Sequence, residues 1–282
     1  MGENRTFIDE FFGFGGFERP IEGYFSWQHI LFVTILMVIM AALAIYFGRK
    51  YNGKDLKTRN KVLIIAALLI DGLELFKILV YCIYEASLDP LKQNLPLFLC
   101  SIQLITIPLA AFSKGRIKEA SLDFVSIFGL LGAVLGTYLA GNNYSSYPVL
   151  SFPNVVSGIT HSISGFSALY ILISGSTSMK KENIFISFSI MFAFAIMAYI
   201  ANLALGTNYM FLVRGDGTPY DIVYNLVNGS KVFYPIIVVL LFVVYIYVFY
   251  YIYYLITSKK EKLSYLIIQL GFFYFFFENL SY

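Results

Sequence analysis

Long apolar stretches are the feature that most constrains how this chain can fold. Seven of them are about 20 residues long, the length that an α-helix needs to cross the hydrocarbon core of a bilayer. Charged residues make up only 13% of the 282 residues, whereas soluble domains carry about 25%. The sequence therefore predicts an all-α, polytopic membrane protein with seven transmembrane helices. The expected helices cover residues 27–48, 62–84, 96–113, 121–140, 155–175, 184–206 and 232–257.

The segments outside these stretches divide the chain into three parts. Residues 1–26 have phenylalanines among acidic residues, a composition typical of an interfacial segment that lies on the bilayer. Residues 27–257 form the expected seven-helix transmembrane domain. Residues 258–282 form a cytoplasmic or interfacial tail, whose apolar run 265–277 is too short to cross. No internal repeat is visible, so we expect one membrane domain.

Lysine and arginine are unevenly distributed between the two sides of the expected bundle. Fourteen of them follow helices one, three, five and seven, and five lie on the other side. Positively charged loops stay in the cytoplasm, so the N-terminus is expected outside and the C-terminus inside. The richness in Ile, Phe, Tyr, Lys and Asn is typical of an AT-rich bacterial genome and favours a bacterial cell membrane.

Cys100 is the candidate nucleophile. Pro96 suits a first helical turn because the amide hydrogen that proline lacks would have no partner there. The sequence therefore predicts a buried helix that begins at residue 96, with the thiol of Cys100 one turn inside it. A helix N-terminus and a nearby histidine favour the reactive thiolate. The alternative is that Cys100 is a small buried residue without chemistry.

Two histidines lie at the same expected depth, near the outer leaflet. His161 is an ionisable group inside a predicted helix, and such groups tend to mark functional sites. Its imidazole is a candidate general base, although serine hydroxyls on the same helix could simply satisfy it. His29, at the start of the first helix, is expected either to meet a lipid headgroup or to anchor the helix at the interface.

Three charged residues recur every third position in the second predicted helix. Asp71, Glu74 and Lys77 therefore lie near one face and are expected to point into the bundle or into a wet cavity. Glu74 could orient a histidine, or it could simply pair with Lys77. A His/His/carboxylate metal site has no spacing motif behind it. We therefore predict neither a metal nor a soluble cofactor.

Small residues in the fourth predicted helix indicate close helix packing. Gly132 and Gly136 are four positions apart, the spacing that lets two helix backbones approach each other in a membrane. The sequence predicts a structural role for both.

Three sequence blocks resemble the YwaF-like integral membrane proteins. They are Leu95-Pro96-Leu97-Phe98-Leu99-Cys100, His161 in the fifth predicted helix and Leu205-Gly206-Thr207-Asn208-Tyr209-Met210; Phe25-Ser26-Trp27-Gln28-His29 fits the start. The likeness covers about residues 20–257, counted against the predicted spans. A vertebrate relative is an acyltransferase that moves fatty acyl chains onto ether phospholipids, and a cysteine of the first block is its proposed nucleophile. The resemblance thus implies that Cys100 is the nucleophile and His161 its histidine. Members commonly have His at the position of Phe98, so this chain departs from the pattern there.

We expect a membrane-embedded acyltransferase that forms a Cys100 thioester with a phospholipid acyl chain. His161 would act as the base, oriented by Glu74 or Asn202. The bilayer and a lipid substrate are the expected partners, nucleic acid is not, and the sequence carries no signal for the oligomeric state. The alternatives are a transporter or lipid-binding protein with a polar pocket at the outer leaflet, and a seven-helix receptor. The expected substrate-binding residues are His29, Asp71, Lys77, Gln103, Asn202, Asn208 and Tyr209.

Overall fold

The computed structural model describes residues 6–177 and 179–258, and helices are the regular structure in this part of the chain. The apolar run 265–277, and the tail beyond residue 258, lie outside the described residues. The α-helices are α1 Phe7–Phe12, α2 Trp27–Tyr51, α3 Leu56–Glu85, α4 Asp89–Gln93, α5 Gln103–Phe112, α6 Gly115–Tyr138, α7 Gly141–Ser146, α8 Phe152–Ile173, α9 Ile184–Leu205, α10 Tyr220–Leu226 and α11 Phe233–Ser258. The 3₁₀-helices are η1 Lys181–Asn183 and η2 Tyr209–Phe211.

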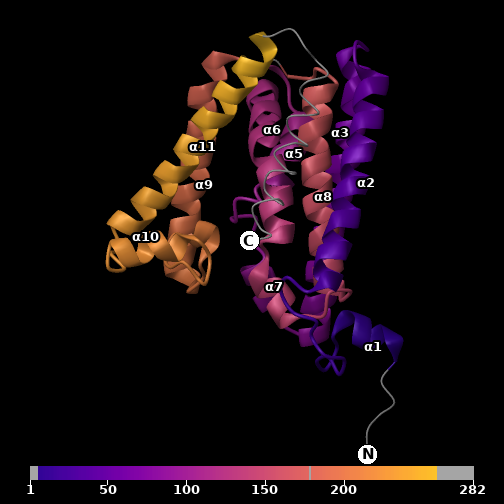
Figure 1. The fold of residues 1–282 in the computed structure, drawn as a ribbon, viewed down its shortest axis with the longest axis vertical. Coiled ribbons are helices and arrows are strands. Elements are labelled where there is room, and N and C mark those ends of the chain that lie inside the picture. The colour runs from indigo at the N-terminus through magenta and orange to yellow at the C-terminus, as the bar shows by residue number, and fades with distance from the viewer. Residues whose placement is uncertain (1–5, 178, 259–282) are drawn as a thin grey trace, which may run out of the picture.

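Helix α6 is the centre of the molecule. Residues 120–129 are buried without interruption, as expected for a helix that other helices surround on all sides. Helix α6 contacts α2, α5, α8 and α9, and α3 packs against α5 and α8. Helices α9 and α11 form a separate pair beside this bundle, joined at one end by α10 (Figure 1).

Five helical stretches are long and apolar enough to cross a membrane. They are Trp27–Tyr51, Gly115–Ser146, Phe152–Ile173, Lys181–Leu205 and Phe233–Leu255. The chain is therefore a multi-pass integral membrane protein. Two of the seven expected spans are not among these five. Helix α3 has 30 residues, but Asp71, Glu74 and Lys77 interrupt its apolar part, and α5 has only 10 residues.

The expected helix from Pro96 to residue 113 is wrong in its first half. Residues 96–102 form successive turns, and the α-helix begins only at Gln103. The Ser101 hydroxyl accepts a hydrogen bond from the Phe98 N–H (3.0 Å) and donates one to the Phe98 carbonyl oxygen (3.1 Å). Serine side chains compete in this way with helical backbone hydrogen bonds. Cys100 consequently lies in a turn just before α5, not within a helix.

The basic connections meet at one end of the bundle, which we call the basic end. Arg59, at the start of α3, donates a hydrogen bond to the carbonyl oxygen of Ser174 after α8 (3.1 Å). Lys180, before α9, forms an ion pair of 3.0 Å with Glu119 at the start of α6. Among the described residues, the basic segments before α3, α6 and α9 therefore lie together, and the basic residues after α11 lie outside the described part of the chain. Helices α1, α7 and α10 lie at the opposite end (Figure 1).

The N-terminal segment packs across the opposite end of the bundle. The Tyr81 hydroxyl of α3 donates a hydrogen bond to the carbonyl oxygen of Phe12 (3.1 Å). The Phe12 ring lies 4.5 Å from the ring of Phe152 at the start of α8, measured between centroids. Phe7 remains 84% exposed. The segment thus covers the ends of α3 and α8 while presenting an aromatic side chain outward.

Candidate functional site

The site is built on two glycines of α6. Gly132 and Gly136 lie on neighbouring turns of one helix face, about 6 Å apart along the axis. A Cβ atom at position 132 would lie 3.4 Å from the Cβ atom of Cys100. A Cβ atom at position 136 would fall inside the imidazole of His161, 2.5 Å from Nδ1. The absence of side chains at these glycines therefore makes room for both candidate catalytic groups on one strip of α6.

Cys100 is half-buried in the turn before α5. The side chain is therefore neither fully buried nor fully exposed.

His161 projects from α8 onto the Gly136 position and is also half-buried. Helices α6 and α8 make the most extensive contact in the bundle, and small residues on both helices bring them close. A Cβ atom at Gly129, for example, would lie 2.8 Å from the Ser164 carbonyl oxygen. This close packing fixes the position of the imidazole relative to the α6 strip.

An ion pair on α3 lies within electrostatic range of both groups. The Lys77 ammonium contacts the Glu74 carboxylate at 2.6 Å, and 14% of each side chain is exposed. Lys77 interacts electrostatically with both Cys100 and His161, and Glu74 with Cys100. Two residues that the sequence placed on one face of a helix thus pair with each other and act electrostatically on the candidate nucleophile and base. The expected role of Glu74 in orienting His161 stays a prediction.

Gln103 supplies an unused hydrogen-bond donor close to Cys100. Its side chain is fully buried at the first position of α5, three residues after Cys100. The side-chain oxygen accepts a hydrogen bond from the Thr106 hydroxyl (3.1 Å). The side-chain nitrogen has no partner among the described residues. Buried amide donors are nearly always paired, so this one is a candidate for binding a substrate oxygen.

Asp71 lies one turn before Glu74 on α3 and is half-buried. One of its carboxylate oxygens is buried without a hydrogen-bond partner among the described residues. The contacts found among the described residues do not join Asp71 to Cys100 or His161, so its expected role in substrate binding stays a prediction.

His29 has a structural role, which corrects the expectation that it meets a lipid headgroup. Its side chain is fully buried. Nδ1 accepts a hydrogen bond from the Phe25 N–H (3.2 Å), so Nε2 carries the proton and donates to the Thr137 carbonyl oxygen (3.1 Å). The ring also packs on Tyr144, with 3.8 Å between centroids. Neither ring nitrogen is left for a substrate.

Asn202 is likewise occupied by the fold rather than free to orient His161. Its side-chain oxygen accepts hydrogen bonds from the Thr207 hydroxyl (2.9 Å) and the Tyr209 N–H (2.6 Å). Its nitrogen donates to the Tyr209 carbonyl oxygen (3.0 Å). Asn202 therefore fastens the loop after α9 to the end of that helix.

Asn208 and Tyr209 complete this loop and are not available as substrate ligands. The Asn208 amide nitrogen donates to the Arg214 carbonyl oxygen and to the Asp216 carboxylate, each at 2.8 Å. Its oxygen accepts hydrogen bonds from the Val213 and Arg214 N–H groups. Tyr209 is fully buried and its hydroxyl donates to the Lys92 carbonyl oxygen. The block 205–210 is therefore a structural clasp.

Phe98 stands where related sequences commonly have His, and its ring packs against aromatic rings of the loop after α9. Its ring lies 4.9 Å from the Tyr209 ring and 6.2 Å from the Phe211 ring, between centroids. The clasp thus holds the turn that carries Cys100.

The described residues contain no group of three or more His, Cys, Asp or Glu side chains that could hold a metal ion.

Sequence reasoning assigned only a packing role to Gly132 and Gly136, and so missed that they receive Cys100 and His161. The signal was present as the four-residue spacing of small residues. What sequence alone does not provide is the identity of the side chains that enter the space.

Comparison with known proteins places this bundle in a family. The family model of the TMEM164 family matches residues 24–253, which include every helix from α2 to α10 and most of α11. Searches of curated proteins and of solved structures returned no match. The YwaF-like resemblance was drawn from much the same part of the chain and remains a resemblance. The chain belongs to the TMEM164 family of membrane proteins.

Proposed function

We propose that this protein is a membrane-embedded acyltransferase that moves a fatty acyl chain between phospholipids through a thioester on Cys100. The observation that carries the proposal is that the Cα and Cβ atoms of Cys100 lie against Gly132, while the His161 imidazole lies against Gly136 one turn away on α6. Covalent acyl transfer requires a nucleophile and a base that come within reach of each other.

In the first step, His161 takes the proton of the Cys100 thiol, and the thiolate attacks the carbonyl carbon of a phospholipid acyl ester. The bond between that carbon and the ester oxygen breaks. The departing alkoxide receives the proton from His161 and leaves as a lysophospholipid. The protein then holds the acyl chain as a thioester.

In the second step, the hydroxyl group of an acceptor lysolipid gives its proton to His161 and attacks the thioester carbonyl carbon. The carbon–sulfur bond breaks, and the Cys100 thiolate recovers its proton from His161. Splitting the transfer into two steps replaces one difficult displacement with two easier ones. Donor and acceptor lipids both arrive by lateral diffusion in the bilayer.

Two further residues would stabilise charge during these steps. The Gln103 amide nitrogen, which lacks a partner in the described structure, would donate a hydrogen bond to the carbonyl oxygen as it becomes negative. Preorganised donors of this kind typically contribute about 10²–10³ in rate. The Lys77 ammonium, held by Glu74, would keep a positive charge next to the site.

We further propose that α3 and the segment 96–112 cross the membrane together with the five apolar helices, giving seven spans in a bacterial cell membrane. Helix α3 is about 45 Å long at 1.5 Å per residue, which exceeds the hydrocarbon thickness. The basic end would face the cytoplasm by the positive-inside rule. The N-terminus and the Cys100 site would then lie toward the outer leaflet.

An acyl-exchange assay with matched cysteine variants tests the function. The full-length protein is reconstituted with a phospholipid carrying an isotope-labelled acyl chain and with a lysophospholipid acceptor. Transfer of the label to the acceptor is followed by lipid mass spectrometry. We expect Cys100→Ser to lose at least about 10³-fold in rate, as nucleophile replacements do. The control Cys82→Ser, which removes a half-buried thiol of α3, should retain the rate. Equal rates for wild type and Cys100→Ser would overturn the proposal.

A further inference from the structure

His29 closes a hydrogen-bonded turn at the N-terminus of α2. Ser26 is the N-cap residue of this helix, and its hydroxyl oxygen accepts a hydrogen bond from the His29 N–H (3.3 Å). The His29 side chain reaches back, and its Nδ1 accepts a hydrogen bond from the Phe25 N–H (3.2 Å). In a capping box, a glutamate or glutamine at this position accepts the returning bond from the N-cap residue. Here a histidine holds the residue before the N-cap, and only the neutral ring has an acceptor nitrogen for it.

The same ring ties the start of α2 to the end of α6. Nε2 donates a hydrogen bond to the Thr137 carbonyl oxygen (3.1 Å), and α6 ends at the next residue. The ring is fully buried and packs on Tyr144 of α7, with 3.8 Å between centroids. One imidazole therefore joins the turn before α2 to two other helices. We call the bonds of His29 to Phe25 and Thr137 the His29 latch.

The backbone that the latch holds is strained. Phe25 has a φ of 60°, a left-handed conformation that bulky residues rarely adopt. Such conformations persist where the surrounding structure holds them. The Phe25 side chain is 47% exposed, so its own packing contributes little, and the bond to His29 Nδ1 fixes the amide. Loss of that bond lets the turn relax away from His29.

The surroundings of the ring do not compensate a positive charge. The neighbouring rings belong to Tyr24, Phe25 and Tyr144, and α6 presents the Thr137 carbonyl oxygen. No charged side chain of the described residues interacts with the imidazole. Glu22, in the preceding loop, instead accepts a hydrogen bond from a backbone N–H before α8 (2.8 Å). A proton on Nδ1 would oppose one N–H to another and leave a buried charge without a partner.

We propose that the His29 latch is an acid-sensitive switch, in which protonation of Nδ1 breaks the Phe25 contact and releases the turn before α2 from the ends of α6 and α7. The proton comes from the solvent at the end of the bundle opposite the basic end. Nε2 keeps its own proton, so the released ring is an imidazolium. The switch does not depend on the proposed acyl transfer.

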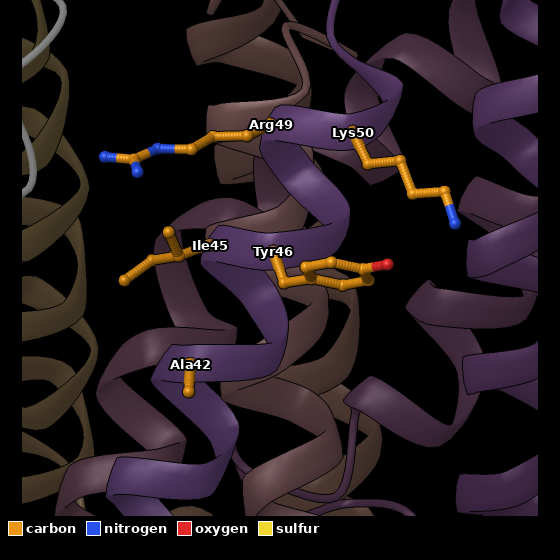
Figure 2. Close-up of a pocket in the computed structure, with 5 residues that line it drawn as sticks. All are labelled: Ala42, Ile45, Tyr46, Arg49 and Lys50. Atoms are coloured by element: carbon orange, nitrogen blue, oxygen red, sulfur yellow. The ribbon is translucent and has the colours of Figure 1, made fainter.

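The contacts at the other end of α2 contain no such group. The Asn52 side-chain nitrogen donates to the Ile173 carbonyl oxygen after α8 (2.7 Å), and a Cβ atom at Gly48 would lie 2.7 Å from that of Ile173. Arg49 and Lys50 point to opposite sides of the helix (Figure 2) and form no ion pair with another described residue. Acid therefore acts on α2 at the end that carries the latch.

The size of the effect follows from proton linkage. An accessible imidazole has a pKa of about 6.5. The closed latch has no room for the second proton, whereas the open turn exposes the ring. Each pH unit below about 6.5 then favours the open turn about tenfold. Between pH 7.5 and pH 5.5 the open population should therefore rise about tenfold.

Hydrogen exchange of the full-length protein in detergent tests the proposal. Mass spectrometry follows the peptide that covers residues 20–30, and each rate is corrected for the intrinsic pH dependence of amide exchange. We compare wild type with His29→Gln, which keeps a donor and an acceptor at this position but gains no proton. The control Thr34→Val removes the neighbouring hydrogen bond between α2 and α6, from Thr34 to the Tyr138 hydroxyl (3.0 Å). His161→Gln controls for the other of the two histidines in the chain.

We expect the protection factor of this peptide to fall about tenfold from pH 7.5 to pH 5.5 in wild type and in both controls. In His29→Gln it should change less than about twofold. Constant protection in wild type, or an equal fall in His29→Gln, would overturn the proposal. A thermal unfolding scan checks that each variant is folded. If His29→Gln does not fold, His29→Asn takes its place, because its side-chain oxygen can occupy the position of Nδ1.

Discussion

The buried polar residues of this membrane protein differ in whether their side-chain hydrogen-bonding groups are all paired, and those of Asn202 and Asn208 are. The side-chain oxygens of both residues accept two hydrogen bonds each from the loop after α9. Gln103, in contrast, has a buried amide nitrogen that meets no acceptor in the described residues. The first two residues therefore stabilise the fold, whereas the third keeps an unused hydrogen-bond donor.

The structural role of Asn202 predicts a loss of stability on substitution. Asn202→Ala leaves the backbone N–H and C=O groups of Tyr209 without their partner, at a cost of about 1–3 kcal/mol for a buried unpaired group. For a chain of this size we expect the Tm to fall by about 5 °C, measured by thermal unfolding in detergent. Asn225→Ala, at an exposed position of α10, is the control and should leave the Tm unchanged. A similar Tm for both variants would argue against the clasp.

The proposed role of Gln103 predicts a defect in rate rather than in binding. Gln103→Leu keeps the volume of the side chain but removes the donor. We expect kcat to fall by about 10²-fold while KM for the donor lipid changes little, because the hydrogen bond strengthens only as charge develops on the carbonyl oxygen. The acyl-exchange assay gives both constants. An increase in KM with unchanged kcat would instead assign Gln103 to ground-state binding.

At this scale the sequence predicts which residues gather better than it predicts what each of them does. Cys100 and His161, which were expected at one depth, both pack against one strip of α6. His29 was expected at that depth too, yet the Phe25 N–H and the Thr137 carbonyl occupy its ring nitrogens. These partners are backbone groups, one of them 108 positions away in the chain, and no side-chain pattern in the sequence reveals them.

Helix α6 determines the geometry of the site, because its Gly132 and Gly136 positions accept the neighbouring side chains. The two glycine positions differ in how much space the neighbouring side chains leave for a Cβ atom. A methyl group at position 136 would overlap the His161 ring, whereas one at position 132 would make close but ordinary contact with Cys100.

A pair of alanine substitutions tests this difference. Gly136→Ala must displace the imidazole, and a misplacement of about 1 Å in a catalytic group can reduce the rate about 10²-fold. Gly132→Ala should reduce it less than about fivefold, because a methyl group there makes ordinary van der Waals contact with Cys100 and displaces nothing. Both variants are compared in the acyl-exchange assay and by thermal unfolding. Equal rates for the two variants would contradict the proposed seating of His161.

Helix positions were largely predictable from hydrophobicity, and their ends were less so. The apolar stretches 184–206 and 232–257 agree within one residue with α9 and α11. The stretch that begins at Pro96 does not form a helix until Gln103. Apolar composition indicates that a segment is buried, but it does not distinguish a helix from a series of turns. Here the Ser101 hydroxyl stabilises turns.

On the scale of the whole molecule, the proposed topology requires α3 to cross the membrane with its three charges. Asp71, Glu74 and Lys77 keep it out of the set of clearly apolar helices. The Glu74 and Lys77 side chains are each only 14% exposed. Such low exposure is expected of charged side chains that point into the bundle.

Single-cysteine labelling tests the proposed topology. In a background that lacks Cys82 and Cys100, Lys54→Cys and Glu85→Cys place thiols at exposed positions near the two ends of α3. With an impermeant maleimide applied to intact cells, we expect labelling of Glu85→Cys, and labelling of Lys54→Cys only after permeabilisation. Labelling of both from outside would show that α3 does not span, and the reversed pattern would invert the orientation.

The central claim, that Cys100 carries an acyl chain during catalysis, is tested most directly by the intact mass of the protein. The full-length chain is incubated with a donor phospholipid without any acceptor, so that the thioester accumulates. We expect a mass increase of one fatty acyl chain that neutral hydroxylamine removes, that persists in Cys82→Ser and that is absent from Cys100→Ser. A wild-type protein that stays at its unmodified mass, or an adduct that survives in Cys100→Ser, would contradict it.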